Sequence, residues 1–190
     1  MGTSRPHAVI AAFLLVASTL IAAEASATTT IALDLGELSV AADEVVVARV
    51  ITSTPEPAQG MIVTRHVVEV ESSIAGVAGP WDDLEVITAG GELDGLGVLV
   101  HGAPRLRTGQ RYLLFLRHTG NAFVVVGQAQ GALRVHEDAG TGDTVVEPAE
   151  ALPSLVRMER GRLVSAIAAV VAPTPLDAVI AAVREARHGR

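Results

Sequence analysis

Short runs of β-branched and other apolar residues, separated by breaks that contain glycine or proline, fill most of residues 44–136 and limit what this chain can fold into. In the run Glu44–Thr52, the residues Val46, Ala48 and Val50 lie on one face of the predicted strand. An apolar residue at every second position is typical of a strand with one buried face. Five or six such strands with turn signals between them predict a small barrel or sandwich.

The turn signals place the predicted strands along the chain. A break with prolines and glycine at residues 55–60 separates the first two strands, which are expected to pair as a hairpin. The strand at 111–117 has apolar residues on both faces, which predicts a central strand covered on both sides. Residues 72–83, 90–97 and 102–109 are expected to form loops. The predicted strands are 44–52, 61–71, 84–88, 111–117, 122–126 and 132–136, and residues 35–43 are expected to form a short helix or turn.

After residue 148 the spacing of apolar residues lengthens to that of helices. Two C-terminal α-helices are therefore predicted, and they are expected to cover the barrel. The second is expected to begin after Thr174 and to end at Gly189. Its arginines leave a second interpretation open, in which this helix docks on an acidic partner or a membrane surface. The apolar stripes are Val164, Ile167, Ala168 and Val171, then Leu176, Ile180 and Val183, and the arginines are Arg184, Arg187 and Arg190.

The N-terminus has the three-part pattern of a cleavable signal peptide. Arg5 precedes an uncharged apolar run at residues 8–23, and the small residues Ala25, Ser26 and Ala27 follow. We expect export by the general secretory route, cleavage after Ala27 and a periplasmic or extracellular location. The apolar run is shorter than the roughly 20 residues of a spanning helix, so no stable membrane insertion is expected after cleavage. The predicted organisation is a signal peptide at 1–27, an OB-like barrel domain at 28–147 and a helical segment at 148–190.

Composition excludes several classes of function. The chain has no cysteine, so disulfides, thiol catalysis and cysteine-type zinc sites are excluded, and stability must come from packing alone. The formal net charge is -7, with 14 basic and 21 acidic residues, which argues against nucleic acid as a partner. Aromatic residues are also sparse, so the stacking surface that binds single-stranded nucleic acid is missing.

Three segments together resemble the netrin module, an OB-fold barrel that tissue inhibitors of metalloproteinases share. These segments are residues 42–50, 73–76 and 109–116. The chain also resembles secreted bacterial domains of this kind, sometimes attached to metzincin-type proteases, in which a Gly-Gln-Ala-Gln-Gly-like turn follows the fifth strand. Here that turn is Gly127–Gly131, and the resemblance covers roughly residues 35–136. It implies a five- to six-stranded OB-like barrel and a secreted protein, such as a metalloprotease, as a partner.

The chain departs from this family pattern at two places. The animal inhibitors chelate the protease zinc with an N-terminal cysteine, whereas the predicted mature chain begins at Thr28. Inhibition by that route is therefore not expected. The usual Lys-Gly at the end of the second strand is Ala75-Gly76 here, which removes a charge but keeps the turn glycine.

No recognised catalytic or metal motif is present in the mature chain. None of its serines lies in a Gly-x-Ser-x-Gly turn, and its histidines are isolated from one another, without His-Glu-x-x-His spacing. His66 and Glu69 lie on opposite faces of a strand because their separation is odd, so His66 is expected at the edge of the core. No catalytic residue, metal or cofactor is assigned. The histidines are His66, His101, His118, His136 and His188.

Five loop residues form the candidate ligand-contact surface, because loops at one end of a barrel carry most recognition. Trp81 could stack on a ligand or, as we favour, cap the barrel end. The glycine-rich stretch at 90–97 is acidic and lacks a phosphate-loop ending, so it is expected to be a flexible loop. The acidic residues lack EF-hand spacing, and no calcium site is assigned. The five residues are Trp81, Asp82, Asp83, Glu92 and Asp94.

These observations favour an exported, non-enzymatic β-barrel that acts as a binding or accessory module. One alternative is a metalloprotease-associated inhibitor or accessory domain. A second is an enzyme whose site is assembled from polar residues on different strands, which sequence order alone does not reveal. The ligand and the oligomeric state are left open.

Overall fold

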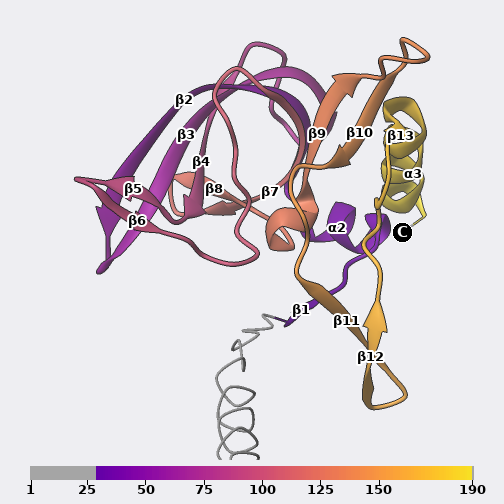
Figure 1. Cartoon of the computed structure of the whole chain (residues 1–190). Helices are drawn as coiled ribbons and strands as arrows, with labels where there is room; N and C mark the ends of the chain where they lie inside the picture. Colours follow the sequence, from indigo (N-terminus) through magenta and orange to yellow (C-terminus); the bar gives the residue numbers. More distant parts are fainter. Residues whose placement is uncertain (1–28, 190) are drawn as a thin grey trace, which may run out of the picture.

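The computed structural model describes residues 29–189, so the predicted signal peptide lies outside the described residues (Figure 1). Over these residues the chain is mainly β, with two α-helices. In chain order the elements are β1 (Thr29–Ile31), α2 (Leu35–Ala41), β2 (Glu44–Ala58), β3 (Met61–Ala75), β4 (Asp83–Ala89), β5 (Gly91–Leu93), β6 (Leu96–Val98), β7 (Arg111–Thr119), β8 (Ala122–Val125), the short 3-10 helix η1 (Gln128–Gly131), β9 (Ala132–Glu137), β10 (Thr144–Pro148), β11 (Ser154–Glu159), β12 (Arg162–Ala166), β13 (Thr174–Pro175) and α3 (Leu176–His188).

The main sheet has eight strands in the order β13-β10-β9-β7-β2-β3-β4-β8. Because β8 pairs with both β4 and β7, the hydrogen-bonded pairs β7-β2-β3-β4-β8 return to their starting strand. The β4–β8 pair is parallel, and the other pairs in this circuit are antiparallel. Strands β9, β10 and β13 continue the sheet outside the circuit, so the structure is not a clean barrel.

The predicted hairpin between the first two long strands is confirmed, but both strands are longer than expected. β2 continues to Ala58, and the turn is confined to Gln59 and Gly60, both with positive φ. Pro55 and Pro57 therefore lie inside a strand. They are tolerated because β2 pairs with β7 only as far as Arg49, which leaves this part of β2 at an edge where a missing N–H need not be paired.

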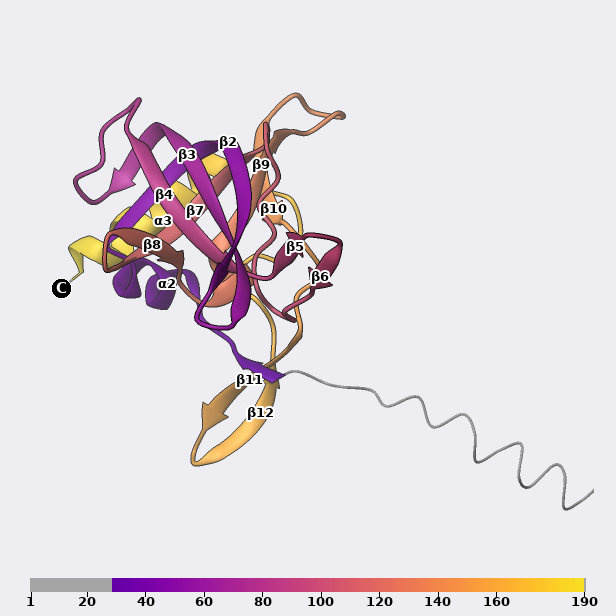
Figure 2. The same ribbon diagram turned by 90° about the vertical axis from the view of Figure 1, so that its left-hand side faces the viewer.

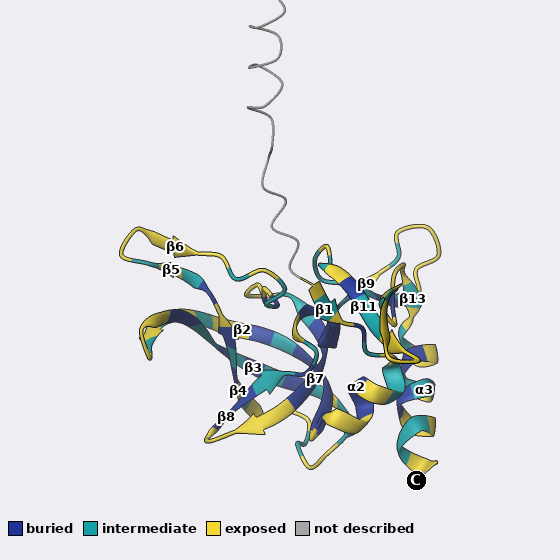
Figure 3. Ribbon diagram, turned by 90° about the horizontal axis from the view of Figure 1, so that it is seen from below, coloured by how far each residue is buried: buried dark blue, intermediate teal, exposed yellow. Residues whose placement is uncertain are grey.

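Apolar side chains fill both sides of the sheet. On β7, Leu113 and Phe115 belong to one buried cluster, while Tyr112, Leu114 and Leu116 belong to the other. The prediction of a central strand covered on both sides is thus confirmed, and the buried residues in Figure 3 concentrate on β2 and β7.

The helices α2 and α3 cover the first of these clusters. α2 confirms the short helix expected near residue 35, and its start is fixed by a capping box between Asp34 and Glu37. α3 buries Val179 and Val183 in the same cluster. Among the described residues, no helix is both long and apolar enough to cross a membrane.

The helix predicted over 164–171 is wrong. Residues 154–166 instead form the hairpin β11–β12, closed by Arg160 and Gly161, and β1 adds to β11 in parallel to make a three-stranded sheet. Both turn residues have positive φ, as in the type I′ turn of a two-residue hairpin, and this conformation is incompatible with a right-handed helix. Within the described residues α3 is therefore the single C-terminal helix.

The ends of α3 agree with the prediction in part. Gly189 follows the helix as expected. The helix also begins after Thr174, at Leu176, but the side chain of Thr174 donates to the carbonyl of Ala172 and makes no capping hydrogen bond. Arg187 donates to the carbonyls of Ser39 and Ala42 at the C-terminal end of α2, where a positive charge also interacts favourably with the helix dipole. This arginine is therefore part of the packing of α3 on α2.

Candidate functional site

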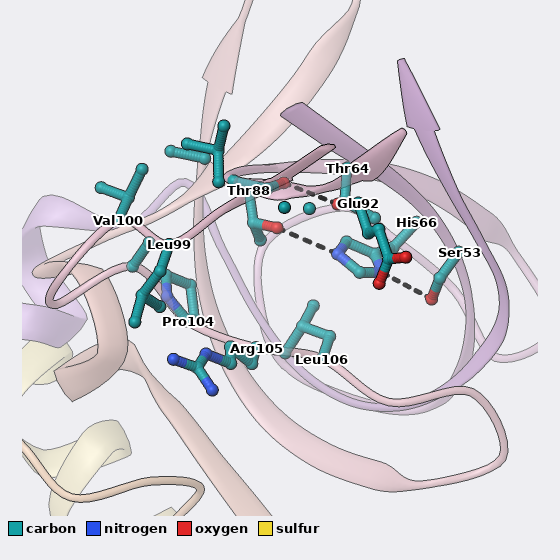
Figure 4. A pocket seen from close by; sticks show the side chains of 16 residues that line it. Ser53, Thr64, His66, Thr88, Glu92, Leu99, Val100, Pro104, Arg105 and Leu106 are labelled. Atoms are coloured by element: carbon teal, nitrogen blue, oxygen red, sulfur yellow. Dashed lines mark hydrogen bonds between the residues drawn. The ribbon is translucent and has the colours of Figure 1, made fainter. Parts of the chain in front are cut away.

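A pocket of about 460 Å³ lies between the distal half of the β2–β3 hairpin, the end of β4 and the chain from residue 90 to residue 106 (Figure 4). This volume falls in the range of ordinary small-molecule sites. Polar side chains make its floor and apolar ones its opposite wall. The floor comprises Ser53, Thr64, His66 and Thr88, and the wall comprises Val98, Leu99, Val100, Ala103, Pro104 and Leu106.

The floor is the continuation of an apolar core face. Along β3, the inward positions Val68 and Val70 are fully buried in the second apolar cluster. The next inward positions towards the hairpin turn are His66 and Thr64, because side chains on a strand alternate between faces. The inward face thus changes from apolar to polar where the pocket begins.

A β-bulge places Ser53 on this same face. Val50 pairs with Val68 and Ser53 pairs with His66, so three steps along β2 match two steps along β3. The extra residue lies at the register shift after Val50, and the exposed Ile51 has no partner there. Strict alternation would have turned Ser53 outward. Bulges commonly re-aim a side chain in this way beside a functional site.

His66 is hydrogen-bonded at both ring nitrogens. Its Nδ1 lies 2.8 Å from Ser53 Oγ, and its Nε2 lies 3.0 Å from Thr88 Oγ1. Thr108 Oγ1 donates to Ser53 Oγ at 3.3 Å, which extends the chain of hydroxyl groups. A neutral imidazole has one donor and one acceptor, and a hydroxyl can serve either, so this arrangement satisfies the neutral ring in either tautomer.

Burial lowers the pKa of His66 to about 4. The residue is only 2% exposed, and the charged form would lose most of its hydration there. No carboxylate is hydrogen-bonded to the ring to offset that loss. The floor of the pocket is therefore neutral at neutral pH, and the imidazole is a weak base.

This burial predicts a loss of stability in mild acid. The unfolded chain takes up a proton on His66 near pH 6.5, whereas the folded protein does so only near pH 4. The contribution of His66 to stability is thus complete above pH 6.5 and is lost as the pH falls towards 4. We expect this residue to lower the free energy of unfolding by about 3 kcal/mol across that window. Urea titrations at several pH values would measure the slope.

The variant His66→Gln is the matched control for this prediction, because its amide can still hydrogen-bond but does not titrate. Its free energy of unfolding is expected to fall less steeply between pH 6.5 and pH 4.5. Equal slopes in the two proteins would contradict the assignment of a lowered pKa to His66.

The segment after β4 forms the roof of the pocket. It is anchored at Gly90, whose N–H donates to the carbonyl of Ile62 and whose carbonyl accepts from Thr64 Oγ1. The predicted loop at 90–97 is instead the small hairpin β5–β6. Charged groups occur only at the rim, where Glu92 is exposed and Arg105 pairs with Glu150 at 3.2 Å.

The structure does not bring the five predicted contact residues together. Glu92 lines the pocket, while Asp94 lies exposed at the β5–β6 turn and does not. Trp81 and Asp82 precede β4 and Asp83 begins it, at the opposite end of that strand from the pocket. The tryptophan is 77% exposed, so the expectation that it caps the barrel is wrong.

Sequence reasoning missed the combination of Ser53, His66 and Thr88, which come from three different strands. The separations of Ser53 and Thr88 from His66 are 13 and 22 residues, and no local motif links them. The alternation along β3 could have put His66 and Thr64 on one face, but the bulge that adds Ser53 leaves no mark in the sequence pattern.

Within residues 29–189, no three histidine, aspartate or glutamate side chains are placed so that they could share a metal ion. No protein-family model matches this chain, and no match is found among curated proteins or among solved structures.

Proposed function

We propose that this protein is an exported, non-enzymatic binding module that takes a small, uncharged and mainly apolar ligand into the pocket over His66. The observation that carries this proposal is the neutral, hydrogen-bonding floor opposite an apolar wall. Pockets that are largely apolar and contain a few well-placed polar groups are typical of small-molecule sites.

The expected ligand is uncharged because the floor has no countercharge. Burying an unpaired charge is costly, whereas a ligand hydroxyl group can donate to the hydroxyl oxygen of Ser53, Thr64 or Thr88. Two charged residues lie at the rim, Glu92 and Arg105. Because their charges have opposite signs, the rim favours neither an anionic nor a cationic ligand.

The strand circuit supports a related proposal about the fold. In the circuit β7-β2-β3-β4-β8, a three-strand meander is closed by a hairpin whose second strand pairs in parallel with the last strand of the meander. We propose that this unit is an OB-like barrel of the netrin kind. A metalloprotease-associated role follows from the resemblance alone and remains a prediction.

An NMR titration with cyclohexanol, cyclohexanecarboxylate and cyclohexylamine tests the proposed ligand class. These probes share an apolar ring and differ in the charge of the attached group. We expect the alcohol to shift the resonances of His66, Thr88 and Leu99 saturably, and the charged probes to shift them less. Thr88→Val removes one floor hydroxyl and should weaken binding of the alcohol roughly fivefold.

The control variant is Thr54→Val, which makes the same change at an exposed position of β2 outside the pocket. It should leave the affinity for cyclohexanol unchanged. Equal binding of the three probes, or shifts confined to other parts of the surface, would contradict the proposal.

A catalytic role is the second candidate, and one observation favours it: Ser53 Oγ lies within hydrogen-bond distance of an imidazole nitrogen. We place it second because a general base works best with a pKa near the working pH, and that of His66 is about 4. Hydrolysis of a neutral ester that is lost in Ser53→Ala, but retained in Thr54→Val, would reverse this order.

A further inference from the structure

The hairpin β11–β12 projects from the body of the protein and carries a free strand edge (Figures 1 and 2). In the sheet β1-β11-β12, the central strand is paired on both sides. β12 has one neighbour among the described residues, so its other edge is open.

The register shows which backbone groups face that open edge. Val156 directs its carbonyl towards β1, because this oxygen accepts from the N–H of Ala32 at 2.7 Å. Its partner across the hairpin, Ser165, therefore directs its N–H and C=O away from β11. Leu163, two residues earlier, does the same. Unpaired N–H and C=O groups in a row are what an added strand binds.

Exposed apolar side chains adjoin this edge. Met158 and Leu163 face each other across the hairpin and are 58% and 59% exposed. At the other end of β12, a cleft of about 570 Å³ is lined by residues that include Leu155, Ala166 and Ile167. An added strand would thus find apolar contacts along its length and an apolar cleft at its end.

The charged side chains at the tip of the hairpin indicate what kind of partner fits it. Arg160 and Arg162 are exposed and form no ion pair with any described residue, whereas Arg157 pairs with Asp34 and Glu37. Glu159 faces Arg162 across the hairpin, and the two arginines at the tip outweigh its charge, although the formal net charge of the chain is -7. They complement an acidic segment and steer its approach.

We propose that the free edge of β12 binds an extended, acidic segment of a partner protein, in which apolar side chains alternate with aspartate or glutamate. The backbone of the segment pairs with Leu163 and Ser165. Its apolar side chains pack on Met158 and Leu163, and its carboxylates lie near Arg160 and Arg162. The site is separate from the pocket over His66, so the two functions can be tested independently.

Fluorescence anisotropy with a short labelled peptide of alternating glutamate and valine tests this proposal on residues 28–190. A peptide of alternating lysine and valine is the matched probe. We expect saturable binding of the acidic peptide that is at least several-fold tighter than binding of the basic one, and that weakens as salt is added.

Two variants separate the backbone and charge contributions. Ser165→Pro removes an outward N–H at an edge position that tolerates proline, and should weaken binding roughly tenfold. Arg162→Gln removes one positive charge without placing a second carboxylate opposite Glu159, and should reduce the preference for the acidic peptide. Circular dichroism and the thermal midpoint would show that both variants fold.

Three outcomes would overturn the proposal. The first is no saturable binding of either peptide, in which case the arginines only protect the edge from pairing. The second is binding that neither variant changes. The third is a dimer in sedimentation velocity that Ser165→Pro dissociates, since the edge would then pair with a second copy of this chain.

Discussion

Replacing Gly131 by alanine is expected to lower the free energy of unfolding by about 3 kcal/mol, because the added methyl group has no room. A Cβ atom at this position would lie 2.1 Å from the carbonyl oxygen of Val126 and 3.2 Å from Cγ1 of Val125. The first of these atoms is backbone, so only a movement of the chain relieves the overlap. Gly131 ends the turn between β8 and β9, which both pair with β7, and the movement would disturb both pairings. Equilibrium unfolding in urea would measure the loss.

Gly97→Ala is the matched control for this substitution. No heavy atom lies within 4 Å of a Cβ built there, and its φ is outside the left-handed range. Its free energy of unfolding should stay within about 0.5 kcal/mol of the parent protein. If Gly131→Ala were equally mild, the turn at residues 127–131 would have to be far more adaptable than its contacts indicate.

The strands near residues 44, 61 and 111 could be predicted because their alternation is a local property. In each strand, runs of alternating residues put apolar side chains on at least one face, which can be seen without knowing the pairing partner. Strand ends were less well predicted. The prolines of β2 look like a break, and only the absence of a neighbour on one side makes them compatible with a strand.

The hairpin β11–β12 could not be recognised from spacing. Val164, Ile167, Ala168 and Val171 recur at helical intervals, yet they span the end of β12 and the irregular chain after it. What fixes β12, which contains Val164, is pairing with β11 across the turn at Arg160 and Gly161, and β11 also pairs with β1, more than a hundred residues earlier in the chain. Tertiary pairing of this kind overrides a local pattern.

The candidate site also depends on strand pairing that cannot be read from the sequence. His66 was noticed as an isolated histidine, but its partners Ser53 and Thr88 depend on a bulge and on the pairing of three strands. Glu92 reaches the pocket, whereas Trp81 and Asp82, which were expected to lie with it at one end of the barrel, do not line the pocket. Strand β4 separates them in space.

Replacing Gln130 by methionine is expected to lower the free energy of unfolding by about 3 kcal/mol, because a buried polar contact is lost without loss of volume. Gln130 is only 4% exposed. Its Oε1 accepts from the N–H of Leu33 at 3.0 Å, and its Nε2 donates to the carbonyls of Ile31 and Gly127 at 2.9 Å and 3.2 Å. The side chain thus fixes the segment after β1 to the turn before β9. Urea unfolding and hydrogen exchange at Leu33 would measure the effect.

The same Gly-Gln-Ala-Gln-Gly turn supplies the control. Gln128 is exposed, and within the described residues its side chain takes part in one hydrogen bond, which its Oε1 accepts from Thr30 Oγ1 at 3.4 Å. Gln128→Met should therefore change the free energy of unfolding by less than about 0.5 kcal/mol and leave hydrogen exchange at Leu33 unaltered. Similar losses in both variants would mean that methionine disturbs the turn itself. A loss in Gln130→Met together with faster exchange at Leu33 would instead identify this glutamine as a contact that holds residues 31–33 on the turn at 127–131.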